Sequence, residues 1–150
     1  MARADGGRLA PAAAGFPPMA ADRSWLRFRF LRPPLIIALV AMWVAGGLVS
    51  LNPYRIDENL GLAALAAGEG TAAWVVLFGA SLWDMALGLA LIVRRHRRLV
   101  GWLQVATIVA YSAIATVTVP ALWLDPFGAL VKNAPVVMAT LVMIATEGEG

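Results

Sequence analysis

The stretch that decides the fold is Thr71–Arg98, TAAWVVLFGASLWDMALGLALIVRRHRR. Its apolar part is long enough to cross a bilayer as a helix, which takes about 20 residues. It stops at four arginines grouped around His96, and it carries one aspartate, Asp84, near its middle. An ionised carboxylate in hydrocarbon is costly unless it is paired, hydrated or protonated, and such residues usually face a bundle interior or a cavity. Asp84 is therefore the strongest functional indication in the sequence.

The composition is that of an integral membrane protein. Of 150 residues, 61% are hydrophobic and 14% are charged, and the mean hydropathy is +0.76, whereas a soluble domain carries about 25% charged residues. Cysteine is absent, and His96 is the only histidine. Disulfides, cysteine metal sites, thiol chemistry and haem ligation by paired histidines are thus excluded, so we expect neither a metal nor a haem on this chain.

The basic residues form two main groups, and each group flanks an apolar stretch. Arg23, Arg27, Arg29 and Arg32 precede the first stretch, and Arg94, Arg95, Arg97 and Arg98 follow the second. The net charge of +3 therefore indicates membrane orientation rather than a solvated patch for nucleic acid. We expect no nucleic-acid partner.

Hydrophobic runs predict an all-α, integral membrane four-helix bundle with spans at about 33–51, 71–93, 99–121 and 129–145. Pro33-Pro34 opens the first helix, because proline is tolerated in a first turn. The fourth run is the shortest, at about 25 Å against a hydrocarbon core of approximately 30 Å. Since the connections opposite the arginines are acidic, the positive-inside rule places both termini in the cytoplasm (N-in, C-in) of a bacterial-type inner membrane.

The two ends of the chain differ from its apolar centre. Residues 1–24 are rich in Ala, Gly and Pro, so we expect a poorly ordered leader before a single domain at 25–146 and a short tail at 147–150. Trp25–Arg32 interleaves aromatic and basic residues, which suits the headgroup region. The alternative is a cleaved signal peptide with Leu35–Val49 as its apolar core, although the residues that follow form a poor cleavage site.

Gly46-Gly47 lie in the outer half of the first predicted helix. They would let a neighbouring helix approach closely, although glycine is also simply tolerated in membrane helices. Because they lie inside a helix, and not between a strand and a helix, they do not form a phosphate-binding loop, and a nucleotide cradle is excluded.

Polar residues on the third predicted span share one helix face. Gln104, Thr107, Tyr111 and Thr118 follow spacings of three, four and seven, which places them in one stripe. Counted from the cytoplasmic end, Gln104 lies at roughly 8 Å, Tyr111 at roughly 18 Å and, on the preceding span, Asp84 at roughly 14 Å. The stripe therefore spans the depth of Asp84.

A small polar face on the second span carries Asp84. Ser81 and Gly88 lie three residues before it and four after it, on the same face. We expect this face to pack against the stripe, with Tyr111 and Gln104 donating hydrogen bonds to Asp84. In one interpretation the cluster only fixes helix pairing. In the other, Asp84 is a carboxylic acid in a cavity that exchanges a proton beside a bound apolar molecule; a carboxylate, a tyrosine and an amide suffice to hold a quinone head group.

The fourth span begins with a second set of polar residues. Because this span enters from the outer side, Lys132 and Asn133 lie in its first turn, more than about 10 Å from the depth of Asp84. We expect Lys132 to pair with Asp125 in the preceding turn, near Trp123 in an aromatic belt. This pair is either an interfacial anchor or a small outward-facing site.

Several short motifs occur in a fixed order along the chain. They are Leu51-Asn52-Pro53, Trp83-Asp84 followed by Gly88, Gln104 with Tyr111, and Asp125-Pro126-Phe127-Gly128 with Lys132-Asn133 and Pro135. With these motifs, residues 35–145 resemble the DoxX-like family of small four-helix membrane proteins. The resemblance implies a membrane partner of an oxidoreductase: relatives are quinone-reducing subunits in thiosulfate oxidation, and this branch often occurs beside or fused to nucleotide-binding dehydrogenase-like domains.

The leading hypothesis is a small membrane subunit of an oxidoreductase or electron-transfer complex that contributes to a quinone or lipid site and contacts a dehydrogenase-like or other redox subunit. The alternatives are a non-catalytic accessory subunit and a proton-coupled transporter, which would need a water path to Asp84. We expect no catalysis by the isolated chain. The candidate catalytic residues are Asp84, Tyr111 and Gln104, and the candidate ligand-binding residues are Ser81, Trp83, Thr107, Asp125, Lys132 and Asn133.

Overall fold

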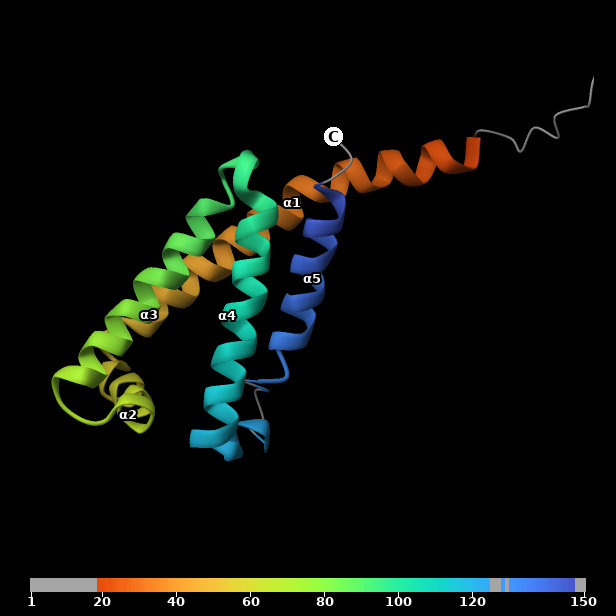
Figure 1. Ribbon diagram of the computed structural model, residues 1–150. Coiled ribbons are helices and arrows are strands. Elements are labelled where there is room, and N and C mark those ends of the chain that lie inside the picture. The colour runs from red at the N-terminus through yellow and green to blue at the C-terminus, as the bar shows by residue number, and fades with distance from the viewer. Residues whose placement is uncertain (1–18, 125–127, 129, 148–150) are drawn as a thin grey trace, which may run out of the picture.

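The structure, a computed structural model, describes residues 19–124, 128 and 130–147, with side chains from Phe30 onward. These residues are helical and contain no strand (Figure 1). The helices are α1 (Met19–Ser50), α2 (Ile56–Ala67), α3 (Thr71–Ala90), α4 (Arg97–Thr118) and α5 (Asn133–Thr146), with short 3₁₀ turns η1 (Arg94–His96) and η2 (Pro120–Leu124). The predicted all-α class is therefore confirmed for the described part of the chain.

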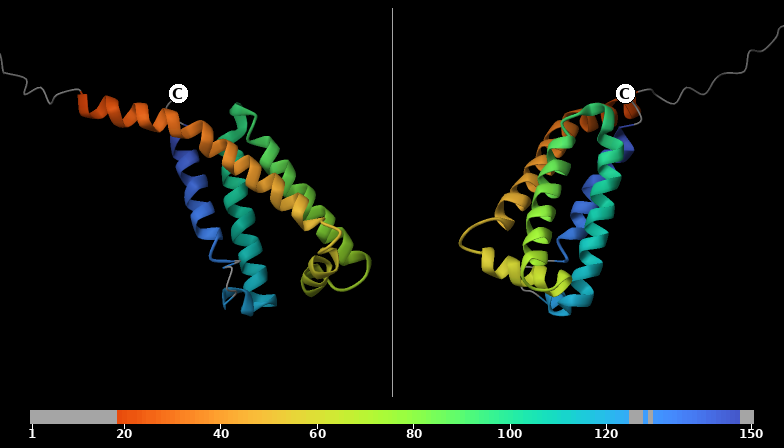
Figure 2. Two further views of the ribbon diagram at one scale, coloured as in Figure 1. Left: turned by 180° about the vertical axis from the view of Figure 1, so that it is seen from behind. Right: turned by 60° about the vertical axis from the view of Figure 1, so that its left-hand side comes forward.

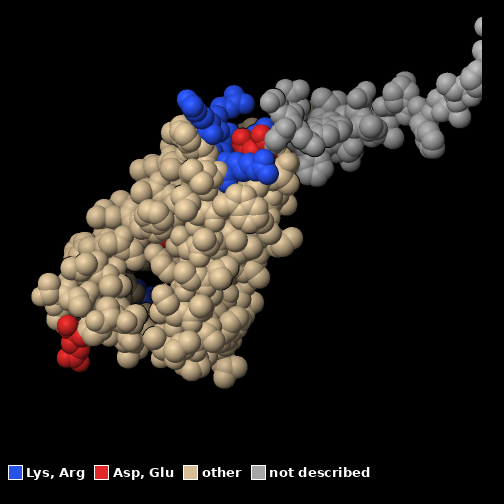
Figure 3. Space-filling model, in the orientation of Figure 1, with Lys and Arg blue, Asp and Glu red and all other residues tan. Residues whose placement is uncertain are grey.

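Three segments are long and apolar enough to cross a membrane: Phe30–Ser50, Thr71–Ala90 and Arg94–Thr118. On the face drawn in Figure 3, charged side chains gather mainly at the ends of the molecule, and the sides of the helices are apolar. Helix α5 has 14 residues, or about 21 Å, which is short for a crossing. The membrane prediction is confirmed, and a fourth crossing stays a prediction.

Helix α1 begins earlier than predicted. It starts at Met19, so Pro33 and Pro34 lie inside the helix and do not open it. The residues from Met19 to Arg32 include neither glycine nor proline, and helical propensity therefore continues up to the prolines. In Figure 2 the N-terminal part of α1 (red) extends away from the other helices, and the rest runs beside α3. The predicted leader is helical from Met19; residues 1–18 lie outside the described part.

Helix α2 was missed, because the acidic connection after the first span was interpreted as a loop. Asp57 and Glu58 occupy its first turn, where negative charge favours the helix dipole. The apolar residues Ile56, Leu60, Ala63 and Ala64 recur at helical spacing and pack with Leu51, Ala73 and Leu77. Asn59 Nδ2 also donates a hydrogen bond of 2.9 Å to the carbonyl of Ser50. The helical spacing of these apolar residues is the feature of the sequence that could have predicted α2.

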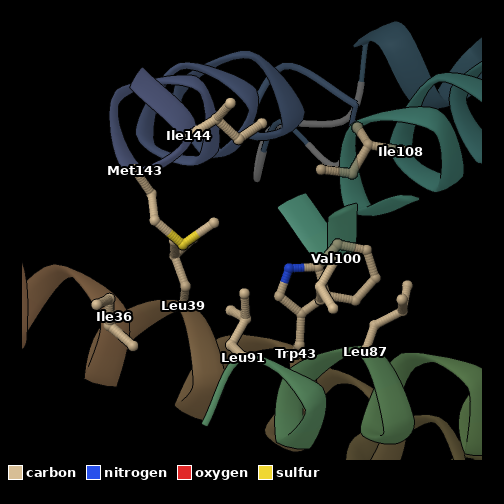
Figure 4. Close-up of a cluster of buried hydrophobic side chains, with 9 residues drawn as sticks. All are labelled: Ile36, Leu39, Trp43, Leu87, Leu91, Val100, Ile108, Met143 and Ile144. Atoms are coloured by element: carbon tan, nitrogen blue, oxygen red, sulfur yellow. The ribbon is translucent and has the colours of Figure 1, made fainter. Parts of the chain in front are cut away.

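Side chains of α1, α3, α4 and α5 converge in one apolar core at the arginine end (Figure 4). Trp43 of α1, Leu91 at the end of α3 and Met143 of α5 are among its buried members. This core holds the apolar helices together near the turn between α3 and α4, whereas the second, smaller cluster joins α2 to the far end of α3.

Glycines set the closest approaches between helices. A Cβ on Gly47 of α1 would lie 2.5 Å from the carbonyl oxygen of Ser81, and one on Gly88 of α3 would lie 3.0 Å from Trp43 Cβ. A Cβ on Gly46 would meet nothing within 4 Å. Of the Gly46-Gly47 pair, only Gly47 therefore permits close packing, and α1 and α3 pack along each other through these two contacts.

Candidate functional site

Asp84 and Tyr111 meet between α3 and α4, as predicted. The Tyr111 hydroxyl donates to Asp84 Oδ1 over 3.3 Å, longer than the usual O–H···O hydrogen bond. Asp84 is half-buried, and Tyr111 retains 38% of its surface. No other donor among the described residues reaches the carboxylate. Asp84 and Tyr111 are therefore in contact, and both remain partly exposed. Figure 3 shows a hollow in the surface between α3 and α4, on the side of α2.

Gln104 does not bind Asp84, and that prediction is wrong. Its Nε2 donates to the carbonyl of Leu87 over 3.3 Å. The carbonyls of Gly88, Leu89 and Ala90 accept from the three amides that follow α3, so Leu87 is left as an unpaired carbonyl at the helix end. An unsatisfied carbonyl in an apolar interior is costly, and the fully buried Gln104 supplies the missing donor.

Trp83 and Thr107 form a second contact between the side chains of α3 and α4. Trp83 Nε1 donates to Thr107 Oγ1 over 3.1 Å. Gln104, Thr107 and Tyr111 thus each contact α3, at three successive levels. Three of the four residues of the predicted stripe therefore face α3, each with a different partner, whereas Thr118 Oγ1 donates to the carbonyl of Ile114 in its own helix over 2.9 Å.

The face that carries Ser81 and Gly88 packs against α1 and not against the α4 stripe, which corrects the second half of the prediction. Ser81 is buried and its hydroxyl donates to the Leu77 carbonyl of its own helix over 2.7 Å. Gly47 and Trp43 of α1 occupy the space beside these residues. The cause is steric, because Ser81 and Gly88 are small enough for α1 to pack closely against this face of α3. Asp84 lies at the edge of the same face, where it contacts Tyr111 of α4.

The outer polar set is only partly described. Asp125 lies outside the described residues, so its pairing with Lys132 stays a prediction; the Lys132 side chain is exposed. Asn133 Nδ2 donates to Ser112 Oγ over 2.8 Å and ties the start of α5 to α4. Trp123 Nε1 donates to Thr116 Oγ1 over 3.1 Å. Sequence reasoning missed both partners on α4.

An ion-pair cluster closes the opposite end of the molecule. Glu147 Oε1 lies 2.7 Å from Arg32 and 3.5 Å from Arg97, so one carboxylate joins α1, α4 and the end of α5. Arg97 Nε also donates to the Leu91 carbonyl over 2.7 Å. Glu147 was predicted only as part of a tail. Its ion pairs were difficult to predict from the sequence, because Arg32 and Arg97 are distant from Glu147 along the chain.

The three apolar segments that are long enough to cross a membrane define a multi-pass helical membrane protein. The chain belongs to the DoxX-like family, whose family model matches residues 40–141. The match confirms the resemblance inferred from the motifs and includes Asp84, Tyr111 and Asn133. No match was found among curated proteins or among solved structures.

Proposed function

We propose that this protein is a small membrane subunit of an oxidoreductase or electron-transfer complex, in which Asp84 and Tyr111 contact a lipid-soluble quinone. One observation carries the proposal: a carboxylate and a phenol meet between two apolar spans, and both remain partly exposed. Polar groups at such depth are costly, and they commonly mark a ligand or proton path. A few polar groups in an apolar site suit a quinone head group.

Asp84, Tyr111 and Trp83 would have different roles at a quinone site. A quinone supplies the redox chemistry, since it takes up two electrons and two protons on reduction. The electrons would come from the partner subunit, and side chains of this chain would hold and transfer the protons. The Tyr111 hydroxyl, which donates to Asp84 in this structure, would instead donate to a head-group oxygen of a bound quinone, and Asp84 would hold one proton at a time and pass it on. Trp83, beside Asp84 and 45% exposed, offers a flat apolar surface to the ring.

The proposed orientation places the arginine end in the cytoplasm of a bacterial-type inner membrane, with four crossings. The positive-inside rule supports this placement. The contacts of Glu147 with Arg32 and Arg97 also bring the membrane entry of α1, the start of α4 and the end of α5 to one level. In Figure 1 the end of α5 and the turn before α4 lie at the same end of the molecule.

The test is Asp84→Asn, with partner-dependent quinone reduction measured in membranes that contain the native complex. The amide keeps the size of the side chain and cannot exchange a proton, so we expect turnover to fall by about 100-fold or more. Asp57→Asn, on the exposed face of α2, is the matched control and should leave turnover unchanged. Equal membrane levels of the two variants show that insertion is intact. Wild-type turnover in Asp84→Asn would refute the proposal.

A second candidate function is a non-catalytic accessory subunit. It is favoured by the three hydrogen bonds between α3 and α4, since these contacts account for the polar stripe by helix pairing alone. In that case Asp84→Leu with a repacked neighbour is tolerated, and the protein always purifies within a larger complex. Loss of quinone reduction in an Asp84→Leu complex that still assembles would exclude this candidate.

A further inference from the structure

Two grooves meet along the outside of α1 at the arginine end. One, of about 440 Å³, is bordered by Arg32, Arg94 and Arg97 and by Ile36. The other, of about 570 Å³, shares Ile36 and Arg97 and continues between α1 and α3 as far as Leu48. Because they share residues, they form one continuous surface feature, which we call the α1/α3 groove.

The mouth of the α1/α3 groove is cationic. Of the described charged side chains there, three are guanidinium groups and one, Glu147, is a carboxylate, which leaves a net charge of 3 − 1 = +2. Glu147 pairs with Arg32 and Arg97, whereas Arg94 is exposed and forms no ion pair with a described residue. Figure 3 shows the basic side chains gathered at this end. An anion is the ligand that this mouth favours.

Beyond its mouth the groove is apolar. Val44 and Leu48 of α1 face Leu89 of α3 and Ile92 just after it. Along α1 the distance from Ile36 to Leu48 is roughly 18 Å, close to the depth of one leaflet of the hydrocarbon core, about 15 Å. The groove therefore has the length of an acyl chain that starts at the arginines.

We propose that the α1/α3 groove binds an anionic phospholipid, with one acyl chain between α1 and α3 and the phosphate at Arg94 and Arg97. Guanidinium groups bind phosphate through paired, charge-assisted hydrogen bonds, and basic residues at a membrane surface select anionic lipids. A zwitterionic lipid carries its own cation and gains less from this mouth. The site is separate from Asp84, so it does not depend on the quinone proposal.

The charge is tested by native mass spectrometry of the full chain, purified with phosphatidylglycerol and phosphatidylcholine of matched acyl chains. Arg94→Gln should lower retained phosphatidylglycerol about fivefold and leave phosphatidylcholine unchanged. The control is Arg95→Gln, because Arg95 is also exposed in η1 but does not border the groove; it should retain the wild-type amount. Equal losses in both variants would overturn the proposal. So would release of the lipid by millimolar inorganic phosphate, which would indicate a site for the free anion.

The apolar part is tested by filling the groove. Ala41 borders it, and Ala38, also exposed on α1, does not. Ala41→Phe should displace the acyl chain and lower retention of phosphatidylglycerol, while Ala38→Phe should retain the wild-type amount. If Ala41→Phe is not monodisperse by size exclusion, Ala45→Phe provides a second variant at the groove. Unchanged retention in a folded groove variant would overturn the proposal.

Discussion

Gly47→Val should lower the free energy of unfolding by about 3 kcal/mol, at the upper end of the range for overpacked interiors. The added Cβ would lie 2.5 Å from the carbonyl oxygen of Ser81 and 2.6 Å from Met85 Cγ. Met85 can change rotamer, but the carbonyl belongs to the backbone of α3, so the two helices must separate. Equilibrium unfolding in mixed detergent and dodecyl sulfate micelles measures the change.

Gly46→Val is the matched control for this experiment. It lies one position earlier on the same helix, and its Cβ would meet nothing within 4 Å. Both variants carry the same change in helix propensity, and the difference between them isolates the packing of α1 on α3. Similar losses of stability in the two variants would show that α1 and α3 do not pack through Gly47.

Glu147→Gln should destabilise the protein by about 2 kcal/mol. Removing one partner of a fully buried ion pair typically lowers stability by about 3 to 5 kcal/mol. The loss is smaller where water partly screens the charges. We therefore expect roughly half of that loss for Glu147→Gln. Side-chain exposure is 10% for Glu147, 24% for Arg32 and 14% for Arg97. The amide leaves two guanidinium groups close together without a counter-charge. The same unfolding titration measures the effect.

The control for Glu147→Gln is Glu58→Gln. Glu58 pairs with Arg55 at 2.7 Å, but the two side chains are 65% and 64% exposed, and such pairs contribute at most about 1 kcal/mol. The prediction also gives a salt dependence, because exposed pairs are screened and buried pairs much less so. A Glu147→Gln effect that is no larger than the Glu58→Gln effect, or that vanishes in high salt, would contradict it.

Hydropathy and helical period predicted the parts of this fold that depend on local sequence. The apolar spans and the common helix face of Gln104, Thr107 and Tyr111 follow from counting residues. Depths estimated from the helical rise per residue correctly predicted that Tyr111 lies near Asp84. The partner of Gln104 depended on where α3 ends. A helix that continued to Val93 would have satisfied the Leu87 carbonyl internally, so an error of a few residues changed the assigned hydrogen bond.

Contacts that depend on the packing of several helices could not be predicted from the sequence. Nothing local to Glu147 indicates that it meets Arg32 and Arg97, because that contact requires the packing of three helices. The approach of α1 to Ser81 and Gly88 likewise depends on which neighbour occupies the small face of α3. Helix α2 is a different case, since its apolar period was present in the sequence and the acidic residues at its start were interpreted as a loop.

The position of Glu147 has a consequence for how the protein is assembled. Glu147 follows the described helices α1 to α5 in chain order, so Arg32 and Arg97 have no access to this carboxylate while the earlier helices are inserted. During insertion their positive charge is fully available to fix orientation. Only after α5 has packed against α4 and α1 can Glu147 join them. In the proposed orientation, the same two arginines would therefore act first during insertion, as positive charges that fix topology. In the folded protein they join α1 and α4 to the end of α5 through Glu147.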